Sequence, residues 1–198
     1  MKKPALRRSA VLLAVLPLAG CISFGAKPPS TLLTLSPTAT VPVGQDQSSA
    51  TAKAIVVTVP VVPAALAVAR VPVRTSATSL AYVKDAQWSE PPARLFARLM
   101  SDTLAAKTGR VVVSQVQAVG ESNDQLDGEL RNFGLDATAR EAVVTFDASL
   151  SRTGTPTTEK RRFEARVPVP AIDAASVGPA INQAANQVAG EVADWVGR

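Results

Sequence analysis

Apolar and polar residues alternate most regularly in the second half of the chain. The stretches 126–130, 144–150 and 163–167 each place apolar residues at every second position, with charged or hydroxyl side chains between them. A period of two is that of a strand with one buried face. Because the connections between the stretches are short, the pattern predicts an antiparallel meander that is covered on one side and wet on the other.

Two other stretches show the helical spacing of three and four residues. The first predicts a helix that begins with Ser89 as its N-cap and is ended by Gly109. The second predicts a helix that starts at Asp173 or Ser176 and carries an apolar stripe as far as Trp195. A coiled-coil partner is the alternative for this stripe, but the run is under three heptads, which favours packing on the domain's own sheet.

Valine-rich segments predict the remaining strands. They comprise residues 53–59, a hairpin of 70–74 with 80–83, and residues 110–113. Pro72 cannot donate a hydrogen bond to a neighbouring strand, so it predicts that the first hairpin strand lies at a sheet edge.

Together these elements predict an α+β fold in one compact domain, residues 53–198, with a mixed, largely antiparallel sheet covered by two main helices. Residues 21–52 are rich in Pro, Ser and Thr and are predicted to be a flexible tether, because they contain too little apolar surface to order fully. Leu32, Leu33 and Leu35 interrupt this composition and are expected to add a short strand to a sheet edge.

Residues 1–20 have the order of a secretory signal: basic residues, then an apolar run, then small residues. A retained transmembrane helix is disfavoured because the run is about half of the ~20 residues that a bilayer requires. The signal closes on Leu18-Ala-Gly-Cys21, which resembles a bacterial lipobox. We therefore expect residues 1–20 to be cleaved and Cys21 to carry an S-diacylglycerol group and an N-acyl chain such as palmitate.

This cleavage changes the charge of the protein. The whole chain has a formal charge of +5, but four of its 21 basic residues and none of its 16 acidic ones lie in residues 1–20. The mature chain has 17 basic and 16 acidic residues and lacks the excess of positive charge that binding to nucleic-acid phosphates needs. No nucleic-acid partner is predicted.

The residue types needed for most catalysis are missing from the sequence. There is no histidine, the only cysteine is expected to be acylated, and neither a dinucleotide-binding nor a P-loop motif occurs. Asp127 and Glu129 form a carboxylate pair, but Arg131 beside them is typical of a solvated sheet surface. We expect no catalytic, cofactor or metal site and no enzymatic activity, with an envelope hydrolase as the alternative that uses Asp127 and Glu129.

Three residues are candidates for a docking surface: Arg70, Arg74 and Trp88. The arginines flank the proline on the expected edge strand, and Trp88 precedes the first helix. Trp88 could instead staple onto the first helical turn, which is the favoured interpretation. The wet face of the meander is the second candidate surface.

Three motifs in order carry a resemblance to a known family. They are Val57-Thr-Val-Pro-Val-Val-Pro63, the run from Ala81 to Pro91 with its tyrosine, tryptophan and Glu-Pro pair, and Leu126-Asp-Gly-Glu-Leu130. In this order after a lipobox they resemble the ABC-type transport auxiliary lipoproteins. The resemblance implies an α/β domain without catalytic residues that works beside an ABC permease, an ATPase and an MCE-type substrate-binding protein, which move lipids or other hydrophobic molecules between two membranes.

The expected function is therefore that of an accessory lipoprotein, anchored at the periplasmic face of the outer membrane, that docks the transport complex between the membranes. Ile22 after the acylated cysteine favours sorting to the outer membrane. A structural or regulatory envelope lipoprotein, such as a cell-wall synthase activator, is the alternative. Homo-oligomers stay open, because an exposed sheet edge could join copies into a ring.

Overall fold

The structure is a computed structural model that describes residues 29–50, 52–114, 117–118 and 123–197. The predicted signal and the lipobox cysteine lie outside these ranges.

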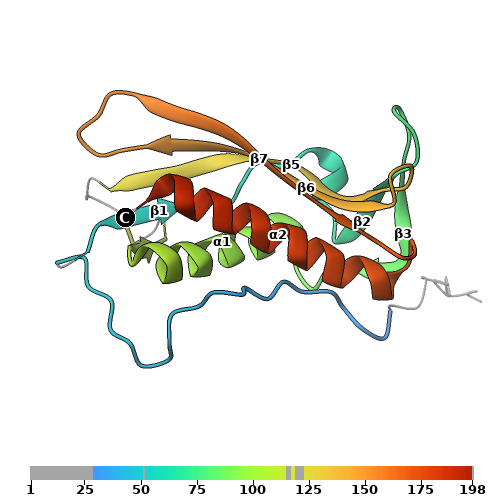
Figure 1. The fold of residues 1–198 in the computed structure, drawn as a ribbon, viewed down its shortest axis with the longest axis horizontal. Coiled ribbons are helices and arrows are strands. Elements are labelled where there is room, and N and C mark those ends of the chain that lie inside the picture. The colour runs from blue at the N-terminus through green and yellow to red at the C-terminus, as the bar shows by residue number, and fades with distance from the viewer. Residues whose placement is uncertain (1–28, 51, 115–116, 119–122, 198) are drawn as a thin grey trace, which may run out of the picture.

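The predicted α+β class is confirmed. A seven-stranded mixed sheet is covered on one side by two helices, α1 and α2, which also pack on each other (Figure 1). The elements are β1 (Ala54–Val57), a 3-10 turn η1 (Ala64–Leu66), β2 (Arg70–Arg74), β3 (Leu80–Gln87), α1 (Pro92–Thr108), β4 (Val111–Val113), β5 (Asp124–Asp136), β6 (Glu141–Ser151), β7 (Thr158–Pro168) and α2 (Ala174–Val196).

The long strand β5 organises the sheet. One of its edges pairs with β6 over its whole length, and β6 pairs with β7, which is the predicted meander. The other edge pairs in parallel with β1 at its start and with β2 at its end, with Val61 bridging to Glu129 between them. An irregularity between Leu130 and Asn132 shifts the register, so that Phe133 again points inward.

The prediction that the Pro72 strand forms a sheet edge is wrong. β2 lies between β3 and β5. The missing N–H is accommodated because β2 pairs with β5 only through Val73 and Arg74, beyond the proline. Gly134 of β5 allows the close approach, since a β-carbon there would collide with the carbonyl oxygen of Pro72.

The ends of the helices follow local chemistry. Pro91, not the predicted Ser89, is the N-cap residue of α1, and Gly109 ends the helix with a φ of 70° in the left-handed region. Asp173 caps α2, and its carboxylate accepts a 2.8 Å hydrogen bond from the Ser176 N–H. The predicted apolar stripe of α2 packs on β6 and β7.

A buried ion pair lies where α1 and α2 end. Arg110 is 2% exposed and donates at 2.7 Å to Asp124 at the start of β5 and at 3.0 Å to the Gly197 carbonyl. Burial alone would raise the pKa of Asp124, but the Thr153 N–H and the guanidinium outweigh it and hold that pKa below its usual value. Arg110 therefore joins the sheet to the ends of both helices.

Within the described residues, Leu33 of the predicted tether pairs with the end of β3. The Leu33 N–H donates to the Gln87 carbonyl at 2.7 Å, and the Ser89 N–H donates to the Leu33 carbonyl at 2.8 Å. Beyond it, Ser36 and Thr38 are hydrogen-bonded to asparagines of α2. We call residues 33–38 the N-terminal strap; Figure 1 shows the blue segment running beside the helices.

Candidate docking surface

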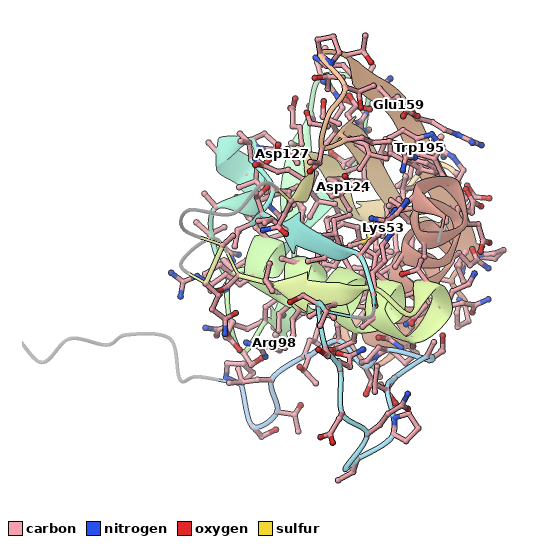
Figure 2. The ribbon with its side chains drawn as sticks, turned by 90° about the vertical axis from the view of Figure 1, so that its left-hand side faces the viewer. Lys53, Arg98, Asp124, Asp127, Glu159 and Trp195 are labelled. Carbon is pink, nitrogen blue, oxygen red and sulfur yellow. The ribbon has the colours of Figure 1, made fainter. Side chains whose placement is uncertain are left out.

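The side of the sheet away from the helices carries charged side chains from three neighbouring strands. We call it the open face; it consists of the outward residues of β5, β6 and β7, which include Asp127, Glu129, Arg131, Glu141, Thr145, Asp147, Lys160, Arg162, Glu164 and Arg166. Asp127 lies on the opposite side of the sheet from α2 and Trp195 (Figure 2). The predicted division into a covered and a wet side is confirmed.

One group of ion pairs is centred on Asp147. Its carboxylate accepts two hydrogen bonds from Arg162, at 2.5 and 2.7 Å, and a longer contact of 3.5 Å from Arg131. The hydrogen bond from Arg162 and the charges of both arginines hold the pKa of Asp147 below its usual value, against a smaller opposing effect of burial. The two arginines therefore favour the ionised form of Asp147 on this face.

A second group is centred on Arg166. Its guanidinium donates to Glu164 at 2.8 Å and contacts Glu141 at 3.4 Å. Burial would raise the pKa of Glu164, but hydrogen bonds from the Thr145 hydroxyl, at 2.8 Å, and from Arg166 lower it overall. Exposed pairs of this kind add at most about 1 kcal/mol each to stability. Their main consequence is a fixed pattern of charge that a partner can match.

A cavity of about 290 Å³ opens at one end of the open face. Its floor is apolar, formed by Pro72 of β2, Gly134 of β5 and Val143 of β6, and Leu66 of η1 contributes to its wall. Val143 points outward yet is only 7% exposed, so the sheet is partly covered here. We call this cavity the η1 pocket.

Three arginines line the η1 pocket, one from each of three strands: Arg74, Arg131 and Arg166. Arg131 and Arg166 have carboxylate partners, whereas Arg74 donates only to the neutral amide oxygen of Asn132, at 3.1 Å. Among the described residues, no carboxylate lies within ion-pair distance of Arg74. Asp136 also lines the pocket, but its carboxylate accepts the N–H groups of Thr138 and Ala139. The pocket therefore combines an apolar floor with one arginine, Arg74, whose charge has no carboxylate partner among the described residues.

The structure separates the three residues predicted for docking. Arg74 lies at the η1 pocket. Arg70 is exposed on the same strand but outside the pocket, with its guanidinium 4.3 Å from the centre of the Tyr82 ring. Trp88 is 1% exposed and packs against Phe133 in a tilted arrangement, with ring centroids 5.3 Å apart. A surface role for Trp88 is wrong, because Leu33 pairs beside it and the core encloses its ring.

The sequence pattern did not predict Arg131 or Arg166 as residues of a binding site. Their positions in the alternating pattern place each on the wet side of its strand, which is a usable signal. Their convergence with Arg74 depends on the parallel pairing of β2 with β5, which no local pattern encodes.

The predicted carboxylate pair is engaged in contacts with its neighbours. Asp127 accepts two hydrogen bonds from the Gln125 amide, at 2.8 and 3.0 Å, and Glu129 contacts Arg131 at 3.4 Å. In the described part of the chain, no three acidic, histidine or cysteine side chains converge into a cluster that could hold a metal ion.

The family model for the ABC-type transport auxiliary lipoprotein component matches residues 33–193. The chain belongs to the ABC-type transport auxiliary lipoprotein family. The match begins at Leu33, the first residue of the N-terminal strap, and so includes the strap with the folded domain.

Two solved structures share the fold of this auxiliary lipoprotein. Protein XCC0632 from Xanthomonas campestris, described as a DUF330 protein, is 20% identical with a TM-score of 0.67, over 84% of this chain and 94% of its own. A second crystal structure, of an uncharacterized protein, is 18% identical with a TM-score of 0.63, over 73% and 92% of the two chains. None of the curated proteins matches this chain. Neither helix of the described residues is long and apolar enough to span a bilayer.

Proposed function

We propose that this auxiliary lipoprotein is anchored through Cys21 at the periplasmic face of the outer membrane and docks an MCE-type ABC lipid-transport complex there. The family match over residues 33–193 carries this proposal. Its role is positional and involves no catalysis of its own. Its partners are the MCE-domain protein, the permease and the ATPase of the same system.

The N-terminal strap limits how far the domain reaches from its anchor. If the free tether ends at Leu33, twelve chain steps separate it from Cys21, which span at most about 40 Å when extended. A tether free up to residue 52 would reach roughly 110 Å. The shorter length keeps the domain close to the membrane and raises its effective concentration for a weak contact there.

The open face is the proposed docking surface. It is the side of the sheet that neither helix covers, and its ion pairs present a fixed arrangement of both signs of charge. Such a surface favours specificity and orientation of a partner over high affinity.

Membrane fractionation and co-purification test the proposal in cells. The wild-type protein should sediment with the outer membrane and co-purify with the cognate MCE-domain protein. Cys21→Ala should release or mis-sort an otherwise folded domain, because it removes the acylated thiol. Outer-membrane retention of Cys21→Ala would refute lipid anchoring, and wild-type protein that co-purifies with no component of the transporter would refute docking.

A further inference from the structure

The η1 pocket has the composition of a ligand site. Ligand pockets are concave and mostly apolar, with a few polar groups that fix orientation. Its floor of Pro72, Gly134 and Val143 offers no side-chain hydrogen-bonding group, and Leu66 and Leu80 add further apolar wall. At about 290 Å³ it lies at the small end of such pockets, so it suits one chain and not a two-chain lipid.

The charges at the pocket determine which head group would fit. Of the three guanidinium groups that line it, Arg166 is paired with Glu164 and Glu141, and Arg131 makes longer contacts with Glu129 and Asp147, which leaves Arg74 as the group without a carboxylate partner. Arg74 is exposed, and no ion-pair partner is found for it among the described residues, so its fork is available for a bidentate bond to an anion. Arg131 adds positive charge beside it, with only long contacts of 3.4 and 3.5 Å to its own carboxylates.

We propose that the η1 pocket binds a single-chain amphiphilic anion. The carboxylate or phosphate head of the ligand pairs with Arg74, and its hydrocarbon chain lies on the floor formed by Pro72, Gly134 and Val143. This site needs no transport partner and does not rest on the proposed docking function, so either can fail without the other.

Photo-crosslinking of the full-length chain in amphipol tests the site. The probe is a laurate analogue with a diazirine on its chain, and mass spectrometry maps the labelled residues. Labelling is expected at Val143, Leu80 or other residues that line the pocket. Unlabelled laurate and dodecyl phosphate should compete, and the stronger competitor identifies the preferred head group. Dodecanol, which has no charge, should compete much less.

Matched arginine variants test the role of charge. Arg74→Gln should weaken labelling about tenfold, as expected for the loss of one charged hydrogen-bonding group. Arg70→Gln removes the same charge from the same strand, outside the pocket, and should label like the wild type. Leu80 is 60% exposed, so Leu80→Glu should fold normally yet repel the anionic head and abolish labelling.

Two results would overturn the proposal. One is equal labelling of Arg74→Gln and Arg70→Gln, which would show that the guanidinium at the pocket plays no part. The other is labelling that dodecanol suppresses as well as laurate does, or that maps outside the pocket, which would show partition onto apolar surface without a site for an anion.

Discussion

Replacing Asn186 with alanine should weaken the attachment of the N-terminal strap to α2. The Asn186 side chain accepts a hydrogen bond from the Thr38 N–H at 2.7 Å and donates one to the Ser36 carbonyl at 3.0 Å. Each such bond contributes about 0.5–1.5 kcal/mol net, and exposed ones fall toward the lower value. Their loss should cost about 1–2 kcal/mol, which raises the open fraction of the strap roughly 5- to 30-fold.

Amide hydrogen exchange measures this opening directly. In Asn186→Ala the Ser36 N–H, which keeps its acceptor Asn182, should exchange faster by that factor, while amides in the centre of β6 exchange as before, because the opening is local. Gln187→Ala is the matched control: it removes a similar amide from the next, exposed position of α2. Equal Ser36 exchange in the two variants would refute the view that Asn186 holds the strap and sets the tether length.

Three further changes test other parts of the structure. Arg110→Met breaks a buried ion pair and leaves Asp124 without the Arg110 guanidinium, so urea denaturation should show a free energy of unfolding lower by about 3–5 kcal/mol. A decrease under about 1 kcal/mol would mean that water solvates the pair. Gly134→Ala should destabilise the protein by about 1–3 kcal/mol, because the added methyl collides with Pro72, and an unchanged urea midpoint would contradict the close packing of β2 on β5. The folded-state pKa of Asp147 is lowered, so its contribution to stability is present above about pH 4 and lost as the pH falls through that lower pKa. In Asp147→Asn the free energy of unfolding should therefore fall less steeply as the pH is lowered below about 4. An unchanged pH dependence would show that the pair with arginine is not kept in solution.

Local patterns were sufficient for most of the secondary structure. The meander, the hairpin of β2 with β3 and the glycine that ends α1 all follow from periodicity and turn chemistry. The extent of β5 was underestimated, because the irregularity after Leu130 interrupts its alternation.

Long-range pairing was not predictable in the same way. Pro72 lacks the N–H that a neighbouring strand would bind, but Gly134 of β5 has no side chain and lets β2 lie inside the sheet. Only the fold brings Gly134 next to Pro72. The position of Trp88 just before a helix predicts a side chain that a partner could contact. Leu33, more than fifty positions earlier in the chain, pairs with Trp88, whose ring lies in the core. The η1 pocket depends on the same pairing of β2 with β5, so the arginines that line it could be placed on a wet face but not together.

Site-specific photo-crosslinking in cells tests the central claim, that the open face docks a transport partner. A benzoylphenylalanine at Lys160 samples the open face, and one at Gln187 samples the exposed side of α2. The account predicts adducts with the MCE-domain protein from Lys160 and not from Gln187. Adducts with that protein from Gln187 alone, or from neither position, would contradict it.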